Sequence, residues 1–175
     1  MIEEKLSEHF WLSEFIRSET AERLGIDNTP GSEMIERLRY LAQWLEVVRN
    51  LLEHPIHVLS GFRCEALERE LTRVDFRAWC ARHGHPADDR FWGVYFKRKA
   101  HPDGRAGDID CPAFGGPLEV CRAIEASEIP FDQLIYEHTW SHIAFPPAGE
   151  MARRQVLTQM PGGGYANGIL EKRAA

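Results

Sequence analysis

The stretch His101-Pro102-Asp103-Gly104-Arg105-Ala106-Gly107-Asp108 decides how the rest of this sequence is interpreted. It places an imidazole and a carboxylate seven residues apart, and these donors suit zinc, which binds N and O atoms at roughly 2.0–2.2 Å. A catalytic zinc usually takes three protein ligands and keeps a fourth position open. His142, in the apolar run 140–145, is the best third candidate. A histidine in such a run is also often an ordinary core or surface residue, so the residues alone leave both interpretations open.

Length, composition and charge exclude several classes of protein. The chain has 175 residues, which fits one domain over 1–175, and its 43% hydrophobic and 27% charged content is typical of a globular protein. A net charge of −6 argues against nucleic-acid binding, and we expect no membrane span because no apolar run approaches about 20 residues. The start of the chain lacks the pattern of a signal peptide, which predicts a cytoplasmic protein with reduced cysteines.

The periodicity of apolar residues predicts an α+β fold, in which N-terminal helices pack on a small, mostly antiparallel sheet that carries the metal site. The core is expected over about 8–160, with an aromatic-rich insertion over about 75–99 that is part helix and part loop. Helices are predicted at 7–25 (two short ones), 32–53, 64–73 and 118–127. Strands are predicted at 56–59, 108–111, 131–137, 140–145 and 153–160.

The strands 131–137 and 140–145 are close enough in sequence to form a hairpin. If its loop is 138–141, Glu137 pairs directly with His142, and paired residues on one face have Cβ atoms about 4.5–5.5 Å apart. A carboxylate would then stand beside the third ligand and could exchange protons during metal-assisted hydrolysis. Asp132 and His138 are weaker candidates for this role.

Two other groups of residues could belong to a functional site, but each also has a simpler structural explanation. The segment Cys80-x-x-His83-x-His85 contains zinc-binding atoms, but it has no fourth partner, which a structural zinc site requires. Arg63 ends the corner Ser60-Gly61-Phe62-Arg63, where a strand gives way to a helix. An arginine at such a corner is either an ordinary surface residue or part of a site.

A family resemblance favours the metal site. The sequence resembles the zinc D-Ala-D-Ala carboxypeptidases and related phage endolysins, which share the hedgehog-type LAS fold. Their signature, His-x-x-Gly-x-Ala-x-Asp followed later by Trp-x-His, is matched by His101, Asp108 and His142 with their neighbours. The corner 60–63 resembles the family's Ser-Gly-Tyr-Arg. Residues 12–30 and 131–135 look typical of a small phage-associated branch.

The resemblance implies one Zn²⁺ per chain, held by His101, Asp108 and His142, and a substrate among peptidoglycan stem peptides. Glu137 would be the general base and acid, and Arg63 would contact the substrate near the metal. The scissile bond stays open between D-Ala-D-Ala and L-Ala-D-Glu. The resemblance also implies a phage or prophage protein, released by a holin-type route or carried with virion proteins.

The sequence departs from the family pattern at two places. Lys99 occupies the position of the usual serine two residues before the first histidine, and the segment between Arg63 and His101 is longer than usual. Both departures concern the substrate cleft. They keep open a second function, a non-catalytic structural or cell-wall-binding component of a phage particle with the same fold.

Overall fold

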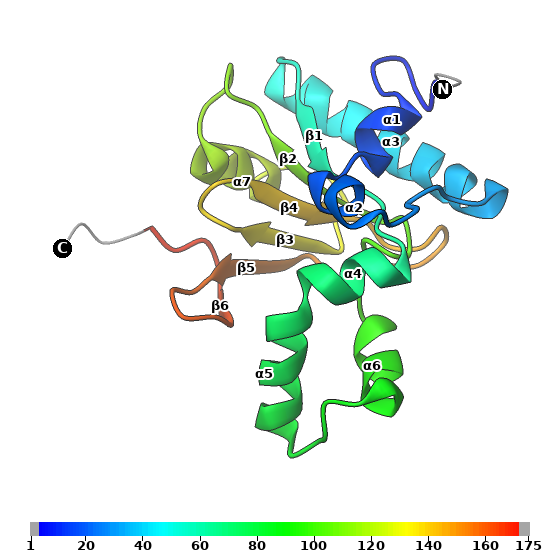
Figure 1. Ribbon diagram of the computed structural model, residues 1–175. Helices are drawn as coiled ribbons and strands as arrows, with labels where there is room; N and C mark the ends of the chain where they lie inside the picture. The colour runs from blue at the N-terminus through cyan, green and yellow to red at the C-terminus, as the bar shows by residue number, and fades with distance from the viewer. Residues whose placement is uncertain (1–3, 172–175) are drawn as a thin grey trace.

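The computed structural model describes residues 4–171 and has an α+β fold, as the sequence predicts. Its open, six-stranded sheet has the order β1-β2-β4-β3-β5-β6 (Figure 1). All neighbouring strands are antiparallel except β3 and β5, which are parallel. The strands are β1 (His57–Ser60), β2 (Ala106–Asp110), β3 (Gln133–Tyr136), β4 (Ser141–Ala144), β5 (Gln155–Gln159) and β6 (Tyr165–Asn167).

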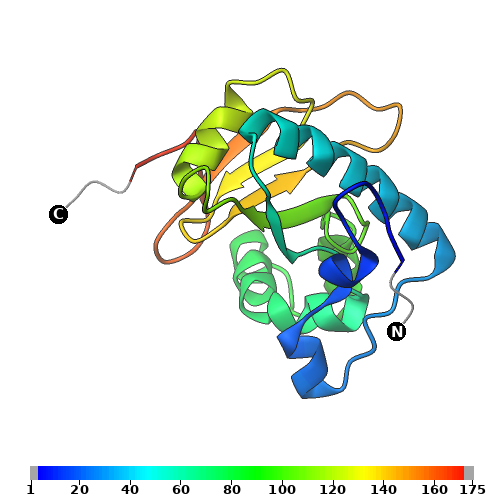
Figure 2. The ribbon, with the colours of Figure 1, turned by 90° about the horizontal axis from the view of Figure 1, so that it is seen from above.

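Helices lie on both sides of this sheet. The long helix α3 and the helix α7 lie on one side, and α4, α5 and α6 lie on the other (Figures 1 and 2). The helices are α1 (Leu12–Ile16), α2 (Glu19–Leu24), α3 (Ser32–Leu52), α4 (Glu65–Leu71), α5 (Arg73–His83), α6 (Asp89–Phe96) and α7 (Pro117–Glu125). No helix in the described part of the chain is long and apolar enough to cross a membrane.

The main core lies between the sheet and the helices α3 and α7. The inward face of α3 repeats leucines at helical spacing, and the facing strands contribute Ile109, Leu134 and Ile143, all fully buried. Burial of this apolar surface is the main stabilising contribution to the fold.

The opposite face of the sheet carries the metal-binding candidates, because successive residues of a strand point to opposite faces. Asp108 pairs with His142, and His142 pairs with Ile135, so these three side chains form a row across β2, β4 and β3. Their sequence neighbours Ile109 and Ile143 point into the core. The sheet therefore separates hydrophobic packing from chemistry.

The aromatic insertion is more regular than predicted. It forms a helical hairpin of α5 and α6, which projects away from the sheet in Figure 1. The hairpin has its own aromatic cluster, separate from the main core, in which Phe76 contacts Trp79, Trp92 and Tyr95. Whether the chain is one domain with an insertion stays a prediction.

Two features of the sheet were not expected. The strand at 153–160 was predicted, but its parallel pairing with β3 was not, and the short strand β6 was not predicted at all. β6 forms because the turn 162–164 consists of three glycines with positive φ, which reverses the chain onto β5.

Candidate metal centre

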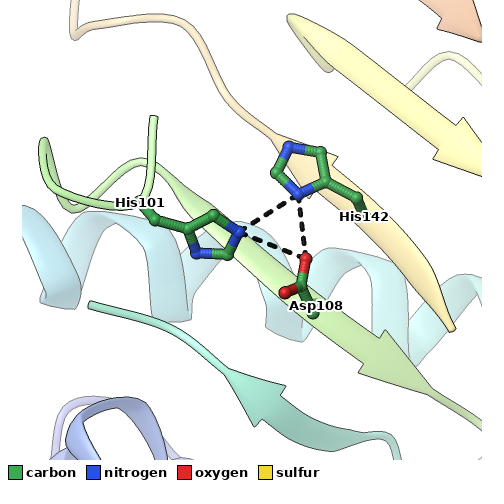
Figure 3. A group of neighbouring side chains, drawn as sticks. All are labelled: His101, Asp108 and His142. Carbon is green, nitrogen blue, oxygen red and sulfur yellow. Dashed lines mark hydrogen bonds and ion pairs between the residues drawn. The ribbon is translucent and has the colours of Figure 1, made fainter. Parts of the chain in front are cut away.

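Three buried side chains, two from the stretch that leads into β2 and one from β4, converge on one point (Figure 3). His101 Nε2 lies 3.2 Å from Asp108 Oδ1 and 3.2 Å from His142 Nδ1. His142 Nδ1 lies 2.9 Å from Asp108 Oδ1. Among residues 4–171, this is the one cluster of three or more histidine, cysteine, aspartate or glutamate side chains whose donor atoms lie close enough together to hold a metal ion.

The spacing of these donors fits a tetrahedral ion. Donors bound at 2.0–2.1 Å in a regular tetrahedron lie about 3.3–3.4 Å apart. The three observed separations are 2.9–3.2 Å, so a small outward adjustment would bring all three donors to bonding distance. Two imidazoles and one carboxylate leave one position for water or substrate, as in catalytic zinc sites.

His101 is held in the tautomer that a metal ligand needs. Its Nδ1 lies 2.7 Å from the carbonyl oxygen of Gly61, so Nδ1–H donates to that carbonyl and Nε2 presents its lone pair to the centre. Burial lowers the pKa of His101 to about 4, although Asp108 opposes this effect. The imidazole is therefore neutral near pH 7, as metal binding requires.

His101 reaches this position from a turn before β2. Gly104 closes the turn with φ of +68°, and its N–H donates to the carbonyl of His101 at 3.0 Å. A Cβ at Gly104 would lie 2.6 Å from Met34 Sδ, so the space as well as the backbone conformation favours glycine.

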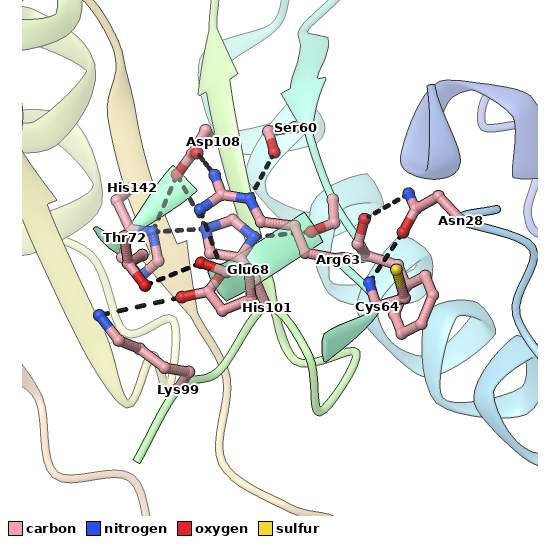
Figure 4. Close-up of polar contacts among 12 residues, drawn as sticks. Asn28, Ser60, Arg63, Cys64, Glu68, Thr72, Lys99, His101, Asp108 and His142 are labelled. Atoms are coloured by element: carbon pink, nitrogen blue, oxygen red, sulfur yellow. Dashed lines mark hydrogen bonds and ion pairs between the residues drawn. The ribbon is translucent and has the colours of Figure 1, made fainter. Parts of the chain in front are cut away.

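The two carboxylate oxygens of Asp108 have different partners. Oδ1 faces the two histidines, and Oδ2 accepts a hydrogen bond from Arg63 Nη2 at 2.5 Å (Figure 4). Burial alone would raise the pKa of Asp108, but its contacts with His101 and His142 hold it well below the usual value. Arg63 thus fixes the orientation of a predicted ligand, in addition to the substrate contact expected from the sequence.

The corner at 60–64 is held firmly against the N-terminal helices. A Cβ on Gly61 would lie 2.8 Å from the carbonyl oxygen of Phe15, so only glycine allows this approach. The buried Asn28 donates to the carbonyls of Ile16 at 2.9 Å and Phe62 at 3.0 Å. Its Oδ1 accepts from the N–H of Cys64 at 2.8 Å. Sequence reasoning treated Asn28 only as a loop residue, because these partners lie far away in the chain.

Sequence reasoning also missed Glu68, which is 1% exposed. One of its oxygens lies 3.6 Å from Arg63 Nη1, and the other lies 3.9 Å from Lys99 Nζ (Figure 4). Burial raises the pKa of Glu68 and lowers that of Lys99. A chain of charges therefore runs from Asp108 through Arg63 and Glu68 to Lys99. The sequence offered one signal that Glu68 is buried, because this acidic residue lies on the apolar side of α4, beside the buried Leu67.

The predicted direct pairing of Glu137 with His142 is wrong. The hairpin loop is 137–140, because Tyr136 pairs with Ser141 and Ile135 with His142. The N–H of Glu137 donates to the carbonyl of Trp140 at 3.2 Å, which closes the loop. The register differs from the predicted one by two residues, so Glu137 is a diagonal neighbour of His142.

Glu137 is still close enough to His142 for this side chain to influence the pKa of the Glu137 carboxyl. Burial raises the pKa of the Glu137 carboxyl, and the nearby His142 partly opposes this effect. The role of Glu137 in catalysis stays a prediction.

The two weaker candidates for the base have other partners. Arg153 donates to both oxygens of Asp132, at 2.9 and 2.6 Å, and these hydrogen bonds lower the pKa of Asp132. His138 has a left-handed backbone with φ of +62°, and its Nε2 lies 2.8 Å from the carbonyl of Gln159. Both side chains are thus engaged in holding the sheet and its loops.

The segment with Cys80, His83 and His85 has a structural explanation. His83 Nδ1 lies 2.8 Å from the carbonyl of Trp79, and His85 stacks on Phe91 with ring centroids 4.1 Å apart. Cys80 is buried in the aromatic cluster of the hairpin. Within residues 4–171 these three side chains do not form a group that could hold a metal.

One comparison with known proteins supports the predicted relationship. Residues 8–72 match the family Peptidase M15. No curated protein matches the chain. The match covers the part of the chain from α1 to α4 and supports the predicted relationship to the zinc D-Ala-D-Ala carboxypeptidases. In general terms it also supports the function of a zinc metallopeptidase that acts on peptidoglycan. His101, Asp108 and His142 lie outside the matched residues, so their convergence is an independent observation.

Proposed function

We propose that this relative of the M15 peptidases is a zinc peptidase that cleaves the stem peptides of bacterial peptidoglycan. The observation that carries the proposal is the convergence of His101, Asp108 and His142, with the tautomer of His101 fixed by Gly61. The bond cleaved is D-Ala-D-Ala or L-Ala-D-Glu. An origin in a phage or prophage, with virion proteins as partners, stays a prediction from the sequence.

Each side chain has a distinct role in this proposal. A zinc ion bound by the three ligands would supply Lewis acidity to water and to the scissile carbonyl. Glu137 would take a proton from the attacking water and return it to the leaving amine. Burial raises its pKa, and this makes the carboxylate a stronger base for the first of these steps. Arg63 would hold Asp108 and help to stabilise the developing oxyanion.

Mass spectrometry of digested muropeptides tests the proposal. We expect the zinc-loaded protein to remove the terminal D-Ala from pentapeptide fragments or to produce peptides that begin with D-Glu. The His142→Ala variant should give neither product. A wild type that binds zinc and cleaves neither bond would support the non-catalytic alternative instead.

A second prediction concerns Arg63. Arg63→Lys keeps the positive charge but loses the planar fork that reaches Ser60, Asp108 and the vicinity of Glu68 together. Because partners of metal ligands typically contribute 10–100-fold to affinity or activity, we expect zinc affinity to fall by about that factor. Competition with a chelator measures it. Arg122→Lys, which alters an exposed arginine paired with Glu171, is the matched control. Unchanged zinc affinity in Arg63→Lys would contradict the role of Arg63 in orienting the metal ligand Asp108.

A further inference from the structure

A cleft of about 750 Å³ lies directly beside the candidate metal centre. Asp108, Arg63 and Ser60 line one side, and Trp140 from the hairpin loop also borders it. It is also lined by a wall at the junction of α1 and α2, which consists of Arg17, Ser18, Glu19, Thr20 and Glu22. Its volume is within the range of about 300–1,000 Å³ that is typical of ligand sites.

Two guanidinium groups line this cleft, and they differ in their partners. Arg63 donates through Nε to Ser60 and through Nη2 to Asp108, and its Nη1 lies 3.6 Å from Glu68, so its positive charge is paired with two carboxylates of the protein. Arg17 is exposed, and its side chain forms no ion pair or hydrogen bond with the described residues 4–171. Of the two arginines that line the cleft, Arg17 is therefore the one whose charge is not paired with any side chain in the described part of the protein.

The wall that carries Arg17 is held at a defined place relative to the metal centre. Asn28 Nδ2 bonds to the carbonyls of both Ile16 and Phe62 (2.9 and 3.0 Å). The N–H of Phe62 also donates to the carbonyl of Phe15 at 2.8 Å. These bonds join the residue before Arg17 to the corner that contains Arg63. A supported backbone places a binding group without a further loss of backbone entropy when a ligand binds.

We propose that Arg17 is a specificity-determining residue that binds a free carboxylate of the stem peptide while the scissile bond lies at the metal centre. This inference rests on the proposed function. Glu19 and Glu22 line the same wall and disfavour an anion beside them, so Arg17 is the group on this wall that attracts a carboxylate. Stem peptides offer two sources of this group, the α-carboxylate of D-Glu and the C-terminal carboxylate.

The test compares three versions of one stem peptide: with both carboxylates free, with D-Glu amidated, and with the C-terminus amidated. Steady-state kinetics are measured for the wild type and Arg17→Gln. We expect Arg17→Gln to lose about 10- to 100-fold in kcat/KM on the free peptide, the range typical of a hydrogen bond to a charged group. The loss should appear mainly in KM. On one of the two amidated peptides, Arg17→Gln and the wild type should have equal kcat/KM, which identifies the carboxylate.

Arg23→Gln is the matched control, because it removes the same charge from an exposed position on α2 outside the cleft lining. It should behave as the wild type does. Calorimetry gives a second readout: the Kd of the free peptide for chelator-treated protein should rise by about the same factor in Arg17→Gln. Equal losses of Arg17→Gln on all three peptides, or an unchanged Kd, would overturn the role of Arg17. A wild type that cleaves none of the peptides refutes the proposed function, whereas the Kd comparison still decides the role of Arg17.

Discussion

Glu137→Gln is expected to give a folded, zinc-loaded protein that cleaves stem peptides about 10²- to 10⁴-fold more slowly than the wild type. Glutamine keeps the shape of the side chain but cannot carry the proton between water and the leaving amine. Glu137 is not a predicted ligand, so the zinc content should stay at that of the wild type. Single-turnover rates with a muropeptide, together with metal analysis of the same samples, measure both quantities.

The pH dependence provides a further check on Glu137. Burial raises its pKa, and only the ionised carboxylate can accept a proton. The wild-type kcat/KM should therefore fall as the pH drops through this raised pKa, and Glu137→Gln should lack that decline. Glu128→Gln, at an exposed position outside the hairpin loop, is the matched control and should keep wild-type activity. Full activity of Glu137→Gln would exclude Glu137 as the base.

The second large effect is expected for the metal ligands. His101→Ala and His142→Ala each remove one of three ligands, so each variant should retain little zinc after dialysis, against about one ion per wild-type chain. Thermal unfolding gives an independent measure. A ligand at 100 times its Kd stabilises the native state by about 2.7 kcal/mol, and this gain from added zinc should be lost in both variants.

His57→Ala is the control for these variants. His57 pairs with Asp110 at 2.7 Å, is well exposed, and lies on the edge strand of the same sheet. Its replacement should leave the zinc content unchanged. Asp108→Asn is expected to give an intermediate loss, because it removes the charge that pairs with Arg63 but keeps the shape. If both histidine variants still bind one zinc per chain, the assigned ligands are wrong.

Much of the fold could be predicted because it depends on local patterns. The helix predicted at 32–53 is observed as Ser32–Leu52, since its leucines repeat at helical spacing along one buried face. The strands β1 to β5 follow from short apolar runs, whereas β6 was not predicted. The hairpin of α5 and α6 was less clear, because Phe76, Trp79 and Trp92 pack on one another and not on the main core. Their pattern therefore does not follow the periodicity of a helix packed on the sheet.

The candidate site also has features that the sequence predicts and features that only the tertiary structure decides. The sequence by itself determined which residues are candidate ligands, because the donor types of His101, Asp108 and His142 and the spacing of their motifs can be recognised without a structure. The tertiary structure alone decided the hairpin register at Glu137, the carbonyl of Gly61 that sets the tautomer of His101, and the partners of Arg63. The contacts of His101 with Gly61 and of Arg63 with Asp108 join residues 40 and 45 positions apart, and the register at Glu137 depends on how the hairpin packs in the sheet, so no local pattern of residues encodes them.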